Sequence, residues 1–481
     1  MDDREQAGVV FPAGPDGRRG TTALGKAVVA AALRPVDPAG AAAAERATAW
    51  RKDYVVHFRR LVEAGLDSPE AWLTVARSGL AAVHERMRFA RPDGIEVPLA
   101  AALTEPAGHQ LGTTQVCGDG EPGEFVLPYG GEQLRGDAIR RCVDGWIGAG
   151  VAEPSLAAVV DAVLAHPDWL RLDGMTVTAL GAGAEMGPLP TLLRWGATVA
   201  AVDLPRPAIW DRLRRAARRG AGRLLLPEAA GTPGVDLLAA VPAVADWLAG
   251  LPGRPVLGNY AYADGGRHVR LTAAADLVAL RLRQQRPELA LAFLATPTDV
   301  FAVPREAVAQ SAGAYRRRPP GRKLLGAATG GRLLRPAYPP DADPGISDSL
   351  VPTQGPNYAL AKRVQRWRAA VARAEGGTVS LHVAPSTRTR SVLSRRALAA
   401  AFAGAHHFGV EVFGPPTANT LMAALLVHDL NAEPVRHEHP WQDEAYAAVH
   451  GGLWRTAYAP RSALGLAAVL GFPTRSGRAR V

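Results

Sequence analysis

The stretch MTVTALGAGAEMGPLPTLLRWGATVAAVDL, residues 175–204, decides the fold of this chain. Its beginning is mostly apolar and predicts a buried strand, and the glycines at positions 181, 183 and 187 predict a tight turn after it. Prolines at 188 and 190 suit a first helical turn, and Gly196 suits a left-handed helix end. Residues 198–202 are uncharged, as in a buried parallel strand. The unit is therefore strand, turn, helix, strand.

Such a unit is suited to binding the phosphates of a nucleotide. Gly181, Gly183 and Gly187 would let the backbone approach a pyrophosphate at the N-terminus of the helix. Asp203 ends the second strand, where an acid accepts hydrogen bonds from a ribose diol. Glu185 is unusual in this turn, because its carboxylate would repel a phosphate. The stretch predicts a Rossmann-type nucleotide site, and a buried turn without a ligand is the alternative.

The composition limits the classes of function. The chain has 481 residues, a formal net charge of +10 and a pI near 10.0. Nearly all of its basic residues are arginine, and alanine, glycine and proline are abundant, which is the bias of a GC-rich genome. The charge is therefore weak evidence for a nucleic-acid partner, and we expect none. The length is sufficient for two or three domains.

No segment for export or membrane insertion is expected. The N-terminus, MDDREQ, is acidic without an apolar signal-peptide core after it, and no uncharged run is long enough to span a bilayer. Cys117 and Cys142 form no redox or metal motif. The histidine pairs at 406–407 and 437–439 lack a second ligand group at a recognised spacing, so no metal site is predicted. We therefore expect a soluble, cytoplasmic protein.

The order of the predicted elements gives the domain organisation. Residues 1–20 are polar and predict a mobile N-terminus, and residues 21–170 predict a mainly helical domain. Residues 171–390 alternate strands with helices, which is the pattern of a doubly wound parallel sheet. Within them, the basic, proline-rich stretch 316–344 predicts a solvated loop. With a C-terminal helical, substrate-side region at 391–481, the predicted fold class is α/β, a Rossmann sheet flanked by two helical regions.

Tyr358 and Lys362 form the most informative short motif. They are four residues apart in a predicted helix and so lie on one face of it. The ammonium of Lys362 is then able to lower the pKa of the phenol and to hold a ribose hydroxyl. A phenol tuned in this way gives or takes the proton that accompanies hydride transfer at a carbonyl or alcohol. A pair on the helix surface without a function is the alternative.

With this motif, the chain resembles the short-chain dehydrogenase/reductase superfamily, and the extended branch most closely. The resemblance spans residues 175–390 and rests on the glycine turn with Asp203, NYAYADG at 259–265, LATPTDVF at 294–301 and GPNYALAK at 355–362. It implies an NAD(P)-binding Rossmann fold. The implied catalytic residues are Tyr358, Lys362, Thr296, Thr298 and Asn259, and the implied cofactor-binding residues are Gly181, Gly183, Gly187, Asp203, Asn259 and Lys362.

The resemblance also implies a role for each of these side chains. Tyr358 would be the acid/base, and Lys362 its partner and a ligand of the ribose. A hydroxyl of Thr296 or Thr298 would polarise the substrate carbonyl, and Asn259 would support the site. The hydroxyl role stays open in the sequence, since the serines at 347 and 349 compete for it.

The cofactor and substrate are less well defined. Asp203 favours the free 2′-hydroxyl of NAD, whereas Arg206 and Arg212 would favour the 2′-phosphate of NADP, and NAD is slightly preferred. Arg388 and Arg390, beyond a predicted strand at 378–383, would hold an anionic substrate group or be surface residues of an arginine-rich chain. The expected partner is a small-molecule substrate. The sequence does not decide whether the protein forms a homodimer.

Three functions follow, in order of preference. The first is an NAD(P)-dependent oxidoreductase that interconverts a carbonyl and an alcohol, or performs epimerase or dehydratase chemistry through a transient keto form. The second is an S-adenosylmethionine-dependent methyltransferase, because residues 178–185 also fit its glycine turn and an acid follows its second strand. The third is a noncatalytic Rossmann-type binding protein, which Glu185 favours. The pair Tyr358 and Lys362 distinguishes the first, because methyl transfer does not need it.

Overall fold

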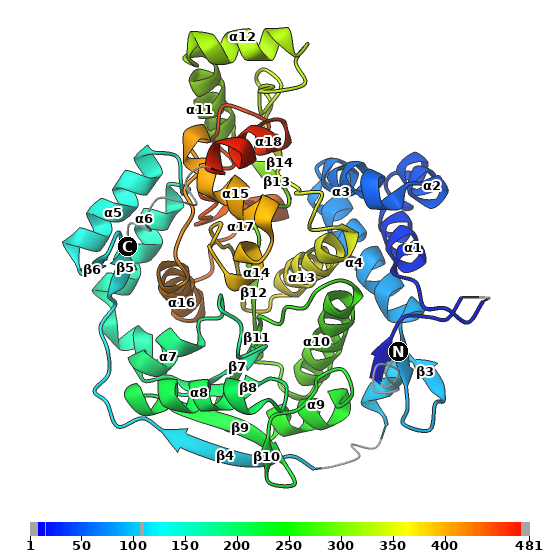
Figure 1. Cartoon of the computed structure of the whole chain (residues 1–481). Helices are drawn as coiled ribbons and strands as arrows, with labels where there is room; N and C mark the ends of the chain where they lie inside the picture. The colour runs from blue at the N-terminus through cyan, green and yellow to red at the C-terminus, as the bar shows by residue number, and fades with distance from the viewer. Residues whose placement is uncertain (1–7, 15, 106–109, 473–481) are drawn as a thin grey trace.

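A mostly parallel sheet forms the centre of the molecule (Figure 1). The computed structural model describes residues 8–14, 16–105 and 110–472. Six parallel strands lie in the spatial order β9 (Arg223–Ala229), β8 (Thr198–Val202), β7 (Met175–Leu180), β11 (Arg254–Asn259), β12 (Ala290–Ala295) and β15 (Val379–Val383). Numbered along the chain, this is the order 3-2-1-4-5-6 of dinucleotide-binding sheets. The predicted α/β, doubly wound Rossmann fold is confirmed.

Both faces of the sheet are buried, because side chains alternate between two hydrophobic cores. In β7, Val177 and Ala179 belong to one core and Leu180 to the other. In β11, Val256 and Leu257 divide in the same way. Since period-2 alternation sends successive side chains to opposite faces and both faces are buried, the strand interiors are mostly apolar. This explains the uncharged runs in the sequence.

Helices cover each face of the sheet. The first core is built with α9 (Val241–Ala249), α10 (Gly266–Gln285) and α13 (Pro356–Ala374), and with α1 (Thr21–Leu33), α2 (Pro38–Arg46), α3 (Trp50–Gly65) and α4 (Pro69–Arg86). The second core is built with α5 (Asp137–Gly148), α6 (Ser155–Ala165), α7 (Leu189–Trp195), α8 (Pro207–Arg219) and α16 (Pro415–Asn431). Figure 1 shows these two sets on opposite sides of the sheet. The segment before the sheet thus contributes helices to both cores.

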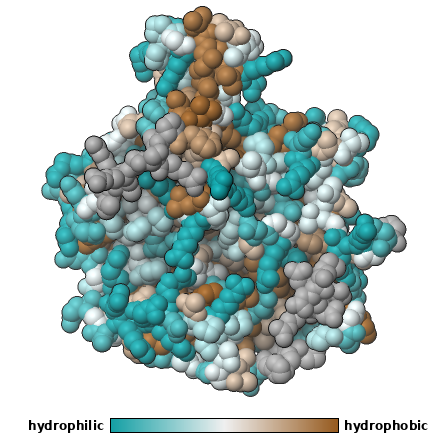
Figure 2. Space-filling model, viewed as in Figure 1, coloured by the Kyte–Doolittle hydropathy of each residue, from teal (hydrophilic) through white to brown (hydrophobic). Residues whose placement is uncertain are grey.

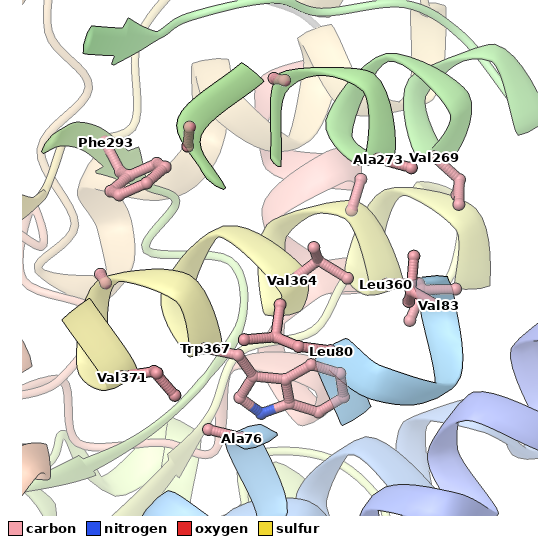
Figure 3. Close-up of a cluster of buried hydrophobic side chains, with 14 of the residues drawn as sticks. Ala76, Leu80, Val83, Val269, Ala273, Phe293, Leu360, Val364, Trp367 and Val371 are labelled. Atoms are coloured by element: carbon pink, nitrogen blue, oxygen red, sulfur yellow. The ribbon is translucent and has the colours of Figure 1, made fainter. Parts of the chain in front are cut away.

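The helix α13, which carries the Tyr358/Lys362 motif, is packed between the sheet and α4. Figure 3 shows Leu80 of α4 beside Val364 and Trp367 of α13, with Phe293 of β12 in the same apolar cluster. The two helices approach closely at Gly79, where a Cβ atom would lie 2.3 Å from the indole ring of Trp367. The packing of α4 therefore fixes the position of α13 on this side.

Short strands and helices complete the fold. They are β1 (Gly8–Val10), β2 (Arg88–Ala90), β3 (Glu96–Pro98), η2 (Leu99–Leu103), β4 (Gly112–Cys117), β5 (Leu127–Tyr129), β6 (Glu132–Leu134), η3 (Pro167–Arg171), β10 (Thr232–Pro233), β13 (Val300–Val303), α11 (Arg305–Arg316), α12 (Pro320–Ala328), β14 (Gly345–Asp348), α14 (Arg390–Leu393), α15 (Arg396–Gly404), η4 (Ala405–Phe408), α17 (Pro440–Ala445) and α18 (Pro460–Gly471). The strands β4 and β10 pair with β9 in antiparallel orientation.

Two segments that were expected to lack regular secondary structure contain some. Part of the expected mobile N-terminus, residues 1–7 and 15, lies outside the described residues, while Gly8–Val10 forms β1 and is buried against β2. The expected solvated loop at 316–344 contains the helix α12, so that prediction is wrong for these residues. Pro320 begins this helix, where its missing N–H costs nothing, and none of its residues is buried.

The helices α11 and α12 project from the body of the molecule (Figure 1). Figure 2 shows hydrophobic residues on this projection, and Leu324 of α12 is 72% exposed. Among the described residues, no helix is long and apolar enough to cross a membrane.

Candidate active site

A cavity of about 780 Å³ lies at the carboxyl ends of the parallel strands. Its walls come from the turns after β7, β8, β11, β12 and β15 and from the N-terminal part of α13. The strand order reverses between β7 and β11, and ligands of doubly wound sheets bind at that point. The cavity therefore occupies the position in which this fold binds ligands.

The glycine turn after β7 forms one wall of the cavity. Gly181 has a φ of +77°, and a Cβ atom there would lie 2.5 Å from the Cα of Ala261, so only glycine fits. The N–H of Gly183 donates to Asp203 Oδ2 at 2.7 Å. The structure thus joins Gly183 to Asp203, while the N–H of Gly181 donates to the carbonyl of Val202. Gly187 lies just before α7, where its carbonyl accepts a hydrogen bond from Asn419, and it is not among the lining residues.

Asp203 faces the cavity from the end of β8. Its Oδ1 accepts the N–H of Leu204 at 2.7 Å, so each carboxylate oxygen has one backbone donor and keeps a lone pair for another. Arg212 donates from Nη2 to the carbonyl of Gly183 at 2.7 Å, and Arg206 lines the cavity nearby. Asp203 is therefore both a support of the glycine turn and an acceptor available to a ligand.

Glu185 also faces the cavity, and it is engaged by Arg390. Its Oε1 lies 2.9 Å from Nε of Arg390, and its Oε2 accepts the backbone N–H of Arg390 at 2.8 Å. The carboxylate thus links the glycine turn to the start of α14. Arg390 is 83% exposed, so the ion pair is open to solvent. Arg388 does not line the cavity, and its backbone N–H donates to Phe413.

Tyr358 lies in the first turn of α13 and lines the cavity. Burial raises the pKa of its phenol to about 12, and a hydrogen bond with Thr296 acts in the opposite direction. The rings of His268 and Tyr262 lie 5.5 and 6.2 Å from its ring, centroid to centroid. The phenol is therefore protonated at neutral pH and packed in a fixed aromatic environment.

Lys362 lies one turn further along α13. Its Nζ donates to the carbonyl of Leu294 at 3.0 Å and to Oε1 of Gln365 at 3.2 Å. Burial lowers the pKa of this ammonium to about 8, while the charge of Asp299 raises it. The group that lowers the pKa of Tyr358 is Thr296 rather than Lys362. A hydroxyl group, and not the expected ammonium, therefore lowers the pKa of this phenol.

The two threonines of the LATPTDVF motif meet at the end of β12. Thr296 Oγ1 and Thr298 Oγ1 lie 2.9 Å apart, and both residues line the cavity. Ser347 and Ser349 form a separate pair, 3.3 Å apart and buried, and neither lines the cavity. Geometry therefore places the threonines, and not the serines, beside Tyr358.

Several buried polar atoms near Tyr358 have no hydrogen-bond partner in the described chain. They are Oδ1 of Asn259, both ring nitrogens of His268 and Oε1 of Gln354. Burial and the charge of Lys362 lower the pKa of His268 to about 3, so this imidazole is neutral. Asn259 was expected at the site, whereas His268 and Gln354 were not, because neither belongs to a motif and α10 reaches α13 only through tertiary packing.

The ionisable residues behind the site form an ion-pair network. Asp299 is 1% exposed and lies 3.1 Å from Arg363 and 2.7 Å from Arg366, both on α13. Arg366 also pairs with Glu444 of α17. The network fixes the orientation of α13.

In the described part of the chain, no three histidine, cysteine or acidic residues are grouped as metal ligands. His437 instead pairs with Asp443.

Comparison with known proteins gives distant similarity to reductases. No protein-family model and no curated protein matches the chain. A-type ketoreductases from a modular polyketide synthase and an A1-type ketoreductase each match 53% of this chain with a TM-score of 0.31 and 16% identity. A thiolation-reductase di-domain from an archaeal non-ribosomal peptide synthetase matches 49% with a TM-score of 0.27 and 11% identity. The chain spans 45%, 46% and 59% of these structures, less than two thirds of each. Because the scores are low, we assign the fold from the strand order and the glycine turn.

Proposed function

We propose that the protein is an NAD(P)-dependent reductase that interconverts a carbonyl and an alcohol in a small-molecule substrate. The observation that carries the proposal is that Tyr358, Thr296 and Lys362 line one cavity at the carboxyl ends of the strands. An acid/base phenol, a neighbouring hydroxyl and a lysine one turn away are the groups that carbonyl reduction requires. The same groups have no role in methyl transfer, so the methyltransferase alternative is not favoured.

The residues of the glycine turn fit a dinucleotide. Gly181 and Gly183 place no side chain between the turn and a pyrophosphate, while the Gly183 N–H itself donates to Asp203 Oδ2. Asp203 would accept hydrogen bonds from the adenosine ribose, which favours NAD, and Lys362 would donate to the nicotinamide ribose. Glu185 opposes the fit through its charge, and its solvent-exposed ion pair with Arg390 offsets part of that charge. NAD(P)H, when bound, would supply the hydride.

The chain's own groups would then handle the proton. Tyr358 is protonated at neutral pH because burial raises its pKa to about 12, so it is poised to donate to the oxygen of the carbonyl. The hydroxyls of Thr296 and Thr298 would hold the same oxygen. Lys362 loses its proton near pH 8, so its ammonium is present at neutral pH for the ribose, while the hydroxyl of Thr296 would stabilise the phenolate that remains.

A noncatalytic binding protein is the second candidate, and the pairing of Glu185 with Arg390 favours it. The test is reduction of simple ketones and aldehydes by NADH and NADPH in the wild type, Tyr358→Phe and a half-buried control outside the cavity, Tyr315→Phe. We expect Tyr358→Phe to reduce kcat by roughly a hundredfold or more at unchanged nicotinamide affinity. Equal activity of both variants would contradict the acid/base role. Nicotinamide binding without any turnover would favour the noncatalytic protein.

A further inference from the structure

A second, smaller cavity lies beside the candidate active site. It has a volume of about 80 Å³ and is bordered by α15, η4, α18 and the segments around them. Its walls are mostly apolar, and include Ala401 and Phe402 of α15, Phe408, Val410 and Leu464. We refer to this space as the apolar chamber.

The apolar chamber and the active-site cavity share a wall. Thr298, Ser386, Leu398 and Phe402 line both of them. Thr298 is also the residue whose hydroxyl bonds Thr296, next to the Tyr358 phenol. If the threonine pair holds the oxygen of a carbonyl group, one of the two substituents on the carbonyl carbon would lie beside the chamber.

Charged groups near the chamber already have partners. Arg461 lies 2.7 Å from Asp348 through Nη1, and Thr456 Oγ1 donates to the carbonyl of Phe408 at 2.8 Å. The hydroxyl of Tyr458 is buried without a hydrogen-bond partner in the described chain, so one weakly polar atom could be accommodated. An ionic group would lose its hydration without gaining a free counter-charge, which is costly. The chamber therefore suits an uncharged, mainly hydrocarbon group.

Two of the helices that border the space, α15 and α18, pack tightly against each other. At Gly404 of α15 a Cβ atom would lie 2.0 Å from the carbonyl oxygen of Ala467 in α18, so the two backbones are in direct contact. Small residues on the inner walls, such as Ala401 and Ala463, leave the remaining space open. A water needs about 10–15 Å³ of such space, so the chamber has room for roughly five to eight heavy atoms.

We propose that the apolar chamber binds the hydrocarbon arm of the substrate, and that the protein therefore reduces ketones or aldehydes with an unbranched apolar arm of about five to eight carbon atoms. The proposal rests on the reductase function proposed above. The chamber would determine the class of substrate, and Thr298 and Tyr358 would determine the position of its carbonyl group.

The first test is a chain-length series of unbranched 2-ketones and aldehydes, with about three to about ten carbon atoms, reduced by NADH or NADPH. In the wild type, kcat/KM should rise by roughly three- to fourfold for each added methylene until the chamber is filled. Ala401→Phe fills the chamber and should abolish this rise while the shortest substrates react as before. Leu464→Ala enlarges it and should move the optimum to longer arms.

The control is Ala397→Phe, which adds the same ring to an exposed position of α15 and should keep the wild-type profile. A flat profile in the wild type, or a profile unchanged by Ala401→Phe, would overturn the proposal while leaving the reductase function intact.

A second measurement separates the two proposals if no carbonyl is reduced. It follows displacement of an apolar fluorophore by straight-chain primary alcohols, in parallel with NADH and NADPH binding. Alcohol affinity that rises with chain length and is lost in Ala401→Phe, without nicotinamide binding, would sustain the chamber and refute the reductase. Nicotinamide binding with alcohol affinity independent of chain length would refute the chamber alone.

Discussion

Glu185 and Arg390 form a contact that joins two walls of the active-site cavity. Glu185 belongs to the turn after β7 and Arg390 to the start of α14, after β15, so residues 205 positions apart in the chain meet at the mouth of the site. The carboxylate uses both oxygens, one on the guanidinium and one on the backbone N–H. It therefore occupies two donors of Arg390 and keeps a negative charge at the turn where a pyrophosphate would be expected.

The charge of Glu185 should weaken dinucleotide binding. We expect Glu185→Gln to raise the affinity for NADH and NADPH by roughly two- to fivefold, because it removes a negative charge close to the phosphates. Isothermal titration calorimetry would measure the change. Glu121→Gln, at an exposed position outside the cavity, should leave the affinity unaltered. Weaker binding in Glu185→Gln would instead mean that the contact with Arg390 is needed to shape the site.

Nicotinamide binding should depend on pH through Lys362. Burial lowers the pKa of its ammonium to about 8, so the charged form prevails below that pH and is lost as the pH rises through it. Two of its three donors are used by Leu294 and Gln365, which leaves one for a ribose hydroxyl. The dissociation constant should therefore rise by about tenfold between pH 7 and 9. Lys362→Met should bind the nicotinamide cofactor weakly at both pH values. If its affinity for the cofactor still showed the wild-type dependence on pH, the assignment of Lys362 as the titrating group would be wrong.

The close approach of α4 and α13 should make Gly79 intolerant of a side chain. A Cβ atom there would lie 2.3 Å from the ring of Trp367, so Gly79→Ala should lower the free energy of unfolding by about 1–3 kcal/mol. Gly145→Ala in α5 is the matched control, since nothing lies within 4 Å of its Cβ position. That variant should be neutral or stabilised by up to about 1 kcal/mol. Equal unfolding midpoints in thermal denaturation would show that α4 and α13 do not pack in this way.

The buried ion pairs of Asp299 should be costly to break. Asp299→Ala leaves Arg363 and Arg366 without this partner, and we expect a loss of about 3–5 kcal/mol in the free energy of unfolding. Asp161→Ala, in an exposed pair with Arg140, should change stability by less than about 1 kcal/mol. Chemical denaturation of both variants measures the difference. Similar losses in the two would mean that the network behind α13 is not a determinant of stability.

The same network predicts a response to acid. The arginines hold the pKa of Asp299 below its ordinary value, despite its burial. A carboxylate with a lowered pKa stabilises the folded state above its unfolded pKa, and that stability is lost as the pH falls. The wild type should therefore lose stability towards low pH more steeply than Asp299→Asn. Parallel stability curves would contradict this role.

The sequence was sufficient where the determinants are local. The glycine turn, Asp203 and the spacing of Tyr358 and Lys362 are set within single βα units, and the parallel strands follow from uncharged runs. By contrast, β4 pairs with β9 through residues more than a hundred positions apart, and its polar sequence GTTQVC gives no sign of that pairing. His268 reaches Tyr358 because α10 packs on α13, and such a contact leaves no spacing to detect.

The choice among the candidate hydroxyls shows the same limit. Spacing left Thr296, Thr298, Ser347 and Ser349 in competition. The fold separates them, because β12 ends at the cavity while Ser347 lies in β14, paired with β13. The domain boundaries and the catalytic roles stay predictions.

The most direct test of the account is a titration of the purified protein with NADH, NADPH and S-adenosylmethionine, for the wild type, Asp203→Asn and the exposed control Asp211→Asn. The amide keeps an acceptor for the Gly183 N–H, so the turn should persist while the charged acceptor for ribose is lost. We predict saturable nicotinamide binding, NADH over NADPH, that Asp203→Asn weakens by roughly tenfold and the control does not change. Binding of S-adenosylmethionine alone, or of none of the three ligands, would contradict the proposed function as an NAD(P)-dependent reductase.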